Sequence, residues 1–297
     1  MKVSVIGYNP KEGPYSYGSV SVWCANGWRE NGHEVEMFDR SEMDRLPKKC
    51  DLYFFVDVSE DYSKSMPDDL DGVKVFWAMD TAMPGGLERS VNIGKKMDYV
   101  FTTNYETYGP KALEKFGIEA MWVPYGYDRG LAEDVKEWSF LEPMDVFMCG
   151  NPNSPERVEL WRLLNEKYKA VTGIIDNRED YIMEKSACKI VVNQPTAGHN
   201  TIINLRVWNA TACGKLLLCK RTVIKEMELL GFKDGVNVVY WDEFKDLFEK
   251  IDYYLEHDDE RRKIANEGAK IGDKHLMVNQ VRVMEQIIYN KFYSRLI

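Results

Sequence analysis

The chain alternates short apolar runs with segments of helical spacing, and this alternation most constrains its fold. The first series opens with the apolar run KVSVIGY, then a Gly/Pro/Ser-rich loop, a helical pattern and a second apolar run in NGHEVEMFD. That order is a strand–helix–strand unit. Further strands are predicted at 50–58, 72–80, 97–104 and 120–126. Apolar strands separated by helices predict a parallel sheet that is covered on both faces.

The pattern restarts after VPYGYDRGLAEDVKEW, which carries proline, two glycines and a cluster of charges. This composition indicates a boundary. Beyond it, strands are predicted at 144–151, 169–174, 188–194, 215–220 and 235–242. Helices are predicted at 154–168, 178–187 and 200–214, as a pair within 243–275 broken at HDD, and at about 279–295.

A chain of 297 residues suits two domains of about 150 residues each. The predicted fold class is therefore α/β, with two tandem Rossmann-like domains facing a cleft. Their expected bounds are 1–126 and 140–278, and a C-terminal helix, 279–297, is expected to cross back to the first domain. A cleft between such domains is the default ligand site.

Binding residues of parallel α/β sheets gather at the carboxyl ends of the strands. In the first half of the chain this rule selects Tyr8, Asp57, Asp80 and Thr103.

Charge and cysteine content limit the partners and the compartment. The net charge of −9 argues against nucleic acid as the main partner, because such proteins usually present a basic face. None of the six cysteines forms a C-x-x-C pair, and several lie in apolar runs. Buried reduced thiols are therefore expected, which favours a cytoplasmic location. No signal-peptide pattern and no apolar run of about 20 residues is present, so no membrane span is predicted.

The stretch NLRVWNATACGKLLLCKR, residues 204–221, places polar side chains before a small-residue helix end and an apolar strand. It is followed by GVNVVYWD, a helix pair containing HDDERRKIANEG, and a closing helix. This order resembles the C-terminal domain of GT-B-fold glycosyltransferases, with the CgeB-like, glycosyl transferases group 1 type as the nearest group. VPYGYD resembles the linker of that family, and VIGYNPKEGPYSYGS matches its first strand and glycine-rich loop only in outline.

The chain departs from the family pattern at two positions. Many GT-B enzymes carry a glutamate where Asn209 stands and another where Thr201 stands, and this pair holds the ribose and sugar hydroxyls of the donor. Asn209 retains hydrogen-bonding groups for a ribose diol, whereas Thr201 cannot mimic a carboxylate. The departure leaves the choice of donor and the stereochemical outcome open.

The resemblance implies a nucleotide-sugar site around the predicted helix 200–214. If that helix begins near Asn200 or Thr201, its N-terminus offers free N–H groups to a diphosphate. Asn204 belongs to the same polar cluster, and Arg206 would add a charge-assisted contact, or would instead form an interdomain salt bridge. Asn209 is a ribose ligand in this reading and a helix-surface amide in the alternative.

Other donor-side candidates lie in two loops. In CGNPNSPER, Gly150 permits close approach of a ligand, and Asn151 and Arg157 add polar groups. The alternative for this segment is an ordinary loop capped by Ser154. His199 precedes the predicted donor helix.

The first loop, NPKEGPYSYGS, matches neither standard phosphate-binding motif, and the alternative for its glycines is a role as turn residues. In the family the corresponding loop faces donor and acceptor. Gly13, Tyr17 and Gly18 are therefore candidates.

Asp80 is the main candidate for a general base, and Asp57 is the second. Each follows an apolar strand, where partial burial raises the pKa of a carboxyl group and makes it a better base. The alternative for Asp80 is a turn cap. The four histidines and six cysteines show no metal-ligand spacing, so no metal and no cofactor beyond the nucleotide sugar is expected.

The predicted function is transfer of a hexosyl or pentosyl group from a nucleotide diphosphate sugar, with UDP ranked first, to a hydroxyl acceptor. The acceptor is open among a glycan, a small molecule, a protein and a modified DNA base, with carbohydrate ranked above DNA. Two alternatives remain: a non-catalytic nucleotide-sugar or glycan-binding protein on the same fold, and a dinucleotide oxidoreductase. The last is weakened because no G-x-G-x-x-G follows either first strand. The oligomeric state is open.

Overall fold

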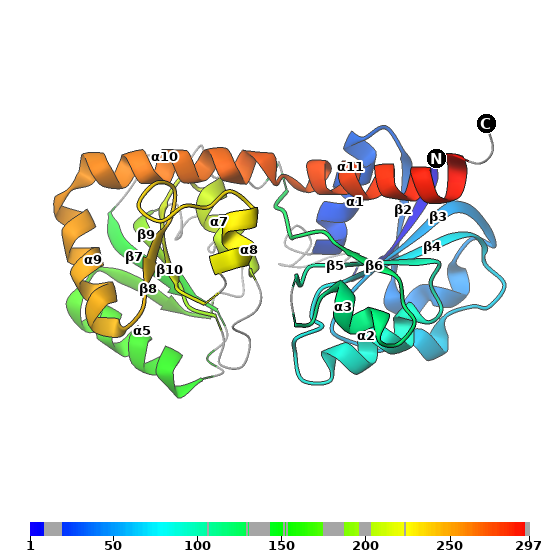
Figure 1. Cartoon of the computed structure of the whole chain (residues 1–297), viewed down its shortest axis with the longest axis horizontal. Coiled ribbons are helices and arrows are strands. Elements are labelled where there is room, and N and C mark those ends of the chain that lie inside the picture. Colours follow the sequence, from blue (N-terminus) through cyan, green and yellow to red (C-terminus); the bar gives the residue numbers. More distant parts are fainter. Residues whose placement is uncertain are drawn as a thin grey trace. The chain divides into compact units, whose positions relative to one another are not determined.

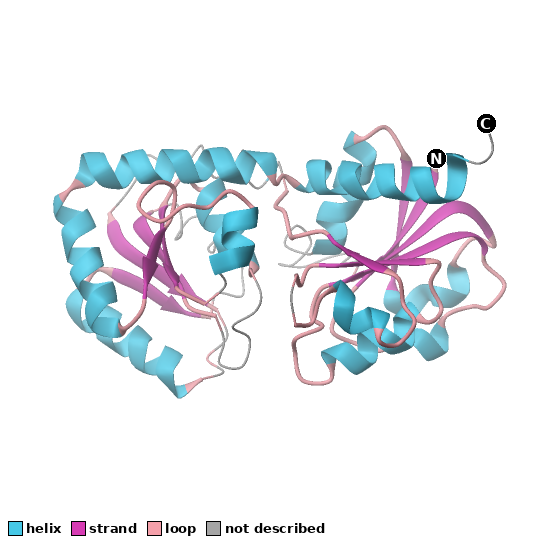
Figure 2. Cartoon of the chain, in the orientation of Figure 1, coloured by secondary structure: helices cyan, strands magenta, loops and turns pink. Residues whose placement is uncertain are grey.

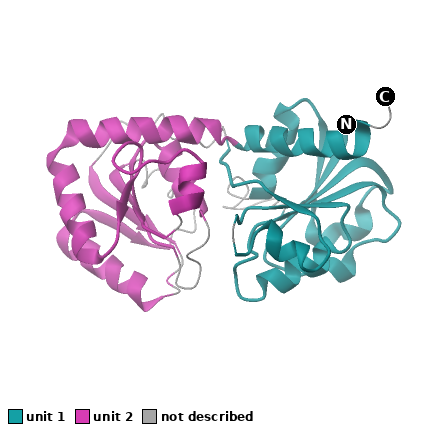
Figure 3. Cartoon of the chain, viewed as in Figure 1, with its two compact units in different colours: residues 1–128, 277–297 teal, residues 129–276 magenta. Residues whose placement is uncertain are grey.

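The computed structural model describes residues 1–8, 20–105, 107–128, 130, 143–150, 152, 154–174, 187–195, 203–222 and 224–294. The chain divides into two compact units, unit 1 (residues 1–128 and 277–297) and unit 2 (residues 129–276), coloured separately in Figure 3. Each unit contains one parallel sheet flanked by helices (Figure 2). The predicted α/β fold with two Rossmann-like domains is therefore confirmed.

Unit 1 has a six-stranded sheet in the order β2-β1-β3-β4-β5-β6, and every pairing is parallel. Its strands are β1 (Lys2–Gly7), β2 (Glu34–Asp39), β3 (Lys49–Val56), β4 (Asp71–Ala78), β5 (Tyr99–Thr102) and β6 (Ala120–Trp122). Its helices are α1 (Val20–Glu30), α2 (Gly86–Gly94), α3 (Pro110–Glu114) and α11 (Met277–Ile288), with short turns η1 (Arg40–Arg45), η2 (Ser63–Ser65) and η3 (Tyr289–Tyr293).

Helices cover both faces of this sheet. Figure 1 shows α1 and α11 on one face and α2 and α3 on the other. On the first face the buried Trp28 of α1 lies edge-on to Phe54 of β3, with ring centroids 5.6 Å apart. The helix α11 packs on α1, which confirms that the C-terminal helix returns to the first domain. A Cβ atom on Gly27 would lie 2.9 Å from Val281, so glycine permits this close approach of the two helices.

Unit 2 has a five-stranded sheet in the order β11-β10-β9-β7-β8, again parallel throughout. Its strands are β7 (Met144–Cys149), β8 (Ala170–Gly173), β9 (Cys188–Asn193), β10 (Leu216–Lys220) and β11 (Val239–Trp241). Its helices are α5 (Pro155–Lys167), α7 (Leu205–Ala212), α8 (Ile224–Leu229), α9 (Phe244–Glu256) and α10 (Asp258–Lys274). One hydrophobic cluster joins the sheet to α5, α9 and α10, while α7 contacts β9, β10 and α10.

Two helical segments of unit 2 were predicted from the sequence. The predicted break within 243–275 is confirmed, because α9 ends at Glu256 and α10 begins at Asp258. Residues 178–186 of the helix predicted at 178–187 lie outside the described part of the chain, which resumes at residue 187.

Candidate functional site

In unit 1, β3, β4 and β5 are neighbours and parallel, so their carboxyl ends share one edge of the sheet. Asp57 directly follows β3, Asp80 follows β4 by two residues and Thr103 directly follows β5. The sheet therefore brings these three polar residues together, as strand-end reasoning predicts. Tyr8 follows β1 at the same edge and is 39% exposed.

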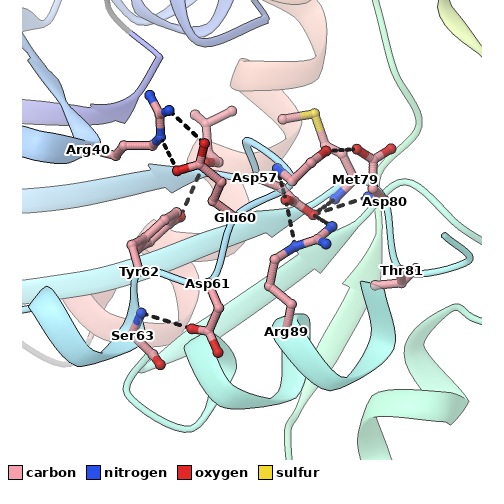
Figure 4. Close-up of polar contacts among 12 residues, drawn as sticks. Arg40, Asp57, Glu60, Asp61, Tyr62, Ser63, Met79, Asp80, Thr81 and Arg89 are labelled. Carbon is pink, nitrogen blue, oxygen red and sulfur yellow. Dashed lines mark hydrogen bonds and ion pairs between the residues drawn. The ribbon is translucent and has the colours of Figure 1, made fainter. Parts of the chain in front are cut away.

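The carboxylate of Asp57 cross-links the two strand ends. It is buried, and its oxygens accept hydrogen bonds from the backbone N–H groups of Ser59 (2.9 Å), Met79 (3.1 Å) and Asp80 (3.1 Å). The guanidinium of Arg89 in α2 also contacts both oxygens at 3.3 Å. Figure 4 shows Asp57 lying between Arg89 and the Met79–Asp80 backbone. This set of contacts makes the Asp57 side chain a buried structural cross-link.

Asp80 lies beside this cross-link and is only partly buried. Its Oδ2 accepts a short hydrogen bond from the hydroxyl of Ser59, and its backbone N–H is fixed on Asp57. Its carbonyl oxygen accepts a hydrogen bond from Met83 N at 3.0 Å, which closes a turn. Gly86 packs against this turn, and a Cβ atom on Gly86 would lie 1.9 Å from the same carbonyl oxygen. The carboxylate of Asp80 is thus held in place yet reachable by solvent.

A second polar layer lies behind Asp80 at the end of β5. The hydroxyl of Thr103 donates to the carbonyl oxygen of Met79 at 2.9 Å, and the side-chain amide of Asn104 donates to the same oxygen at 3.3 Å. Burial raises the pKa of the Tyr125 phenol well above 10, and the charges of Asp80 and Asp57 push it in the same direction. Tyr125 is therefore neutral beside the acids.

In unit 2, the corresponding edge gathers arginines instead of acids. β9 and β7 are neighbours, so Asn193 and Gln194 at the end of β9 lie near Gly150 at the end of β7. The N-termini of α5 and α7 bring Arg157 and Arg206 to this edge.

Both guanidinium groups converge on one backbone oxygen. The carbonyl oxygen of Gln194 accepts from Arg157 Nη2 at 2.5 Å and from Arg206 Nη2 at 3.4 Å. Arg206 Nε also donates to Asn193 Oδ1 at 3.2 Å. Burial and the adjacent charge of Arg206 lower the pKa of Arg157 to about 10, so Arg157 is still cationic at neutral pH.

Gly150 permits this arrangement. Its φ angle is +142°, and a Cβ atom there would lie 2.7 Å from Nη1 of Arg206. Only glycine suits both the backbone conformation and the approach of the guanidinium.

The helix carrying Arg206 begins later than the sequence predicts. It starts at Leu205, not near Asn200 or Thr201, because Asn204 is its N-cap and accepts from Arg206 N at 3.0 Å. The amide nitrogen of Asn204 donates to Asn193 Oδ1 at 3.0 Å, which ties the helix start to β9. The expected helix N-terminus at 200–201 is therefore wrong, and Asn204 positions Arg206.

Asn209 lies in the middle of α7 and is 7% exposed. The alternative of a helix-surface amide is wrong for this residue, because it is buried. Six other candidates fall outside the described residues: Gly13, Tyr17, Gly18, Asn151, His199 and Thr201.

Four residues of the two sites were missed from the sequence: Ser59, Arg89, Asn193 and Gln194. Asn193 and Gln194 end the apolar run CKIVVNQ, so the strand-end rule that selects Asp57 would have found them. Arg89 resembles an ordinary helix arginine in the sequence, and only tertiary structure pairs it with Asp57.

Three further observations concern the described residues as a whole. All six cysteines are buried and free, as predicted. Within the described ranges, no three His, Cys, Asp or Glu side chains are grouped closely enough to hold a metal ion. In the same ranges no helix has the length and hydrophobicity needed to cross a bilayer.

Comparison with known proteins gives one family match. Residues 157–286, from α5 into α11, match the family described as glycosyl transferase-like. No curated protein sequence matches the chain significantly.

Solved structures resemble the chain over nearly its whole length. Anabaena Alr3699/HepE in complex with UDP-glucose is 13% identical, with a TM-score of 0.65 over 98% of this chain and 100% of that one. An alpha-glucosyltransferase in complex with UDP-glucose and DNA containing an abasic site is 11% identical, with a TM-score of 0.66 over 98% and 100%. Sucrose-phosphate synthase from Thermosynechococcus elongatus is 11% identical, with a TM-score of 0.63 over 99% of each chain.

These likenesses agree with the resemblance that the sequence itself carries. The chain has the fold of the GT-B glycosyltransferases, and its residues 157–286 are similar to the glycosyl transferase-like family.

Proposed function

We propose that the protein transfers a hexosyl or pentosyl group from a nucleoside diphosphate sugar to a hydroxyl acceptor. The observation that carries this proposal is the convergence of Arg157 and Arg206 on the Gln194 carbonyl oxygen. Two adjacent guanidinium groups repel one another, and a diphosphate relieves that repulsion while accepting charge-assisted hydrogen bonds. The N-termini of α5 and α7 add positive dipole ends at the same edge.

UDP is the nucleotide ranked first. The solved neighbours HepE and the alpha-glucosyltransferase carry UDP or UDP-glucose, which supports this choice. On the donor side we propose Gly150, Arg157 and Arg206 as diphosphate contacts, with Asn204 positioning Arg206 and Asn209 serving the ribose hydroxyls. Asn151, His199 and Thr201 complete the proposed donor site, and the loop with Gly13, Tyr17 and Gly18 contributes from unit 1.

The proposed reaction breaks the bond between the anomeric carbon of the sugar and a β-phosphate oxygen. The acceptor oxygen forms the new bond to that carbon, and the departing electron pair remains on the diphosphate, which the two arginines stabilise. The proton of the acceptor hydroxyl passes to the carboxylate of Asp80. Asp57 is the weaker candidate for this base, because backbone N–H groups and Arg89 already occupy its oxygens.

Two further parts of the proposal concern metal and location. The arginine pair supplies the positive charge that a divalent cation would otherwise provide, so we expect transfer in the presence of a chelator. The six buried free thiols fit a reducing compartment such as the cytoplasm.

The acceptor is ranked with carbohydrate above a modified DNA base, because the net charge of −9 opposes binding to a polyanion. The alternative is a protein that binds a nucleotide sugar without turning it over, which the asparagine at position 209 favours.

The test begins with a thermal-shift panel of UDP, GDP, ADP, dTDP and NAD. A ligand at 100 times its dissociation constant should stabilise the fold by roughly 2.7 kcal/mol. Stabilisation by one nucleoside diphosphate, followed by release of that diphosphate from its sugar with a carbohydrate acceptor, supports the proposal. Binding without turnover selects the alternative, and a response to NAD alone contradicts both.

A further inference from the structure

Ser59 has an unusual backbone conformation. Its φ angle is +62°, and it is the one residue other than glycine with positive φ in the part of the chain that the structure describes. Residues that have a Cβ atom rarely adopt a positive φ angle, and a serine in this conformation is sterically strained. Such strained residues persist where the surrounding structure over-determines them, and they cluster at functional sites.

The surroundings of Ser59 account for its conformation. Its backbone N–H donates to Asp57 Oδ1 at 2.9 Å. The same carboxylate is fixed by Arg89 and by the N–H groups of Met79 and Asp80. The turn after β3 is therefore tied to the end of β4, and the tie brings the Ser59 hydroxyl to Oδ2 of Asp80.

A serine at position 59 supplies a hydroxyl group to Asp80. Glycine would occupy this conformation without strain, yet glycine has no hydroxyl to give to Asp80. The side chain of Ser59 is exposed, so burial of apolar surface does not explain it.

We infer that Ser59 is a positioning residue that orients the carboxylate of Asp80 and stabilises its ionised form. The inference rests on the proposed function for the role of Asp80 as base, while the contact itself does not. A hydroxyl donating to a carboxylate favours the charged state. Without it, Asp80 would gain freedom of rotation and would bind a proton more readily.

Three titratable or charged groups lie around Asp80 on neighbouring elements: Asp57 after β3, which accepts from the Asp80 backbone, Arg89 in α2, which contacts Asp57, and Tyr125 after β6, whose phenol senses the charge of Asp80. Asp57 and Arg89 are the charged groups of this set, and they contact each other. Both remain in a Ser59 variant, so a change in titration reports the lost hydroxyl.

The experiment compares Ser59→Gly and Ser59→Ala with the parent protein. Ser59→Gly removes the strain and the hydroxyl, whereas Ser59→Ala removes only the hydroxyl. We expect a roughly tenfold fall in turnover at neutral pH for both, the usual scale of one hydrogen bond to a charged group. Donor affinity should stay unchanged, and the acidic limb of the pH–rate profile should move to higher pH. Ser65→Ala, an exposed serine in η2, is the matched control and should do neither.

A readout without catalysis separates the inference from the proposed function. Carbon-13 NMR of labelled aspartate, with Asp80 assigned from Asp80→Asn, follows its titration directly. A higher midpoint in Ser59→Gly supports the inference even if no sugar transfer is found. Equal midpoints in the two proteins, or a Ser59→Gly variant with parental turnover and pH profile, would overturn it.

Discussion

The strand ends of the two units carry opposite charges on the same kind of parallel sheet. In unit 1 the buried carboxylate of Asp57 meets Arg89, so this charge is compensated inside the protein. In unit 2 the buried Arg157 has another arginine, Arg206, as its neighbour, and burial together with the charge of Arg206 lowers the pKa of Arg157. A compensated charge holds loops together, whereas two like charges held side by side favour an anionic ligand.

The contrast in charge suits the two units to different roles in the proposed reaction. Unit 2 would hold the donor through its cations, and unit 1 would supply the acid–base group beside a neutralised pair. Asp57 and Asp80 differ in a similar way. The carboxylate of Asp57 is buried and fully engaged by its contacts, whereas that of Asp80 stays partly exposed. The predictions below test each side of the contrast.

The largest expected effect comes from Asp80→Asn. Loss of a general base lowers turnover by about 10²- to 10⁴-fold. Steady-state kinetics and calorimetry together check this, because donor affinity should not change. Asp61→Asn removes an exposed acid of the same unit and is the control. Retained turnover in Asp80→Asn would remove it as the base.

Asp57→Asn should act on stability rather than on the donor site. Removing one partner of a buried ion pair costs about 3–5 kcal/mol, because Arg89 keeps a buried charge. The free energy of unfolding from urea denaturation measures this cost. The Arg40–Glu60 pair, visible in Figure 4, is more exposed, so Glu60→Gln should cost less than about 1 kcal/mol. Equal costs for the two variants would show that the Asp57 pair is not a structural cross-link.

Arg206→Ala should weaken UDP binding by about 10- to 100-fold, the worth of charge-assisted hydrogen bonds. Calorimetry gives the dissociation constants. Arg221→Ala is the control, because Arg221 is paired with Asp234 and Asp242. If both variants bound UDP like the parent, Arg206 would have no part in the donor site.

Gly150→Ala should weaken UDP binding through Arg206, by a smaller factor of roughly 3- to 30-fold, since the guanidinium shifts and is not lost. Gly173→Ala places the same strain at the end of the adjacent strand, where φ is +110° and no atom lies within 4 Å of the added Cβ. Both variants should lose stability, and only Gly150→Ala should lose affinity. The same loss of affinity in both would mean that strain, and not contact with Arg206, is responsible.

The smallest expected effect concerns His275. Burial lowers the pKa of its imidazole, so the unfolded chain binds the proton more readily than the folded protein. The contribution of His275 to the free energy of unfolding is therefore present above the ordinary histidine pKa of about 6.5. It is lost as the pH falls toward the lower pKa of His275 in the folded protein. His275→Gln should therefore flatten the fall in unfolding free energy between neutral and mildly acidic pH. His257→Gln, which changes an exposed histidine, is the control, and an unchanged slope in His275→Gln would contradict the account.

The fold could be predicted from the sequence because apolar residues are spaced differently in strands and in amphipathic helices. The runs around residues 50–58 and 188–194 became the buried strands β3 and β9, and the HDD break between α9 and α10 fell where expected. The start of α7 was harder to predict, because the N-cap role of Asn204 depends on its own contacts with Arg206 and Asn193.

The site was predictable only where strand ends define it. Asp57, Asp80 and Gly150 were found because parallel strands deliver their carboxyl ends to one edge. The pairing of Arg89 with Asp57, the shared Gln194 carbonyl oxygen and the positive φ of Ser59 arise from tertiary structure, and no spacing in the sequence encodes them.

The most direct test of the central claim is calorimetric titration of the unmodified protein with UDP and with uridine. If the Arg157–Arg206 pair carries donor binding, the diphosphate must be recognised, and UDP should bind at least about 100-fold more tightly than uridine. Equal affinity for the two ligands, or no binding of UDP, would contradict the assignment of this edge of unit 2 to a nucleoside diphosphate.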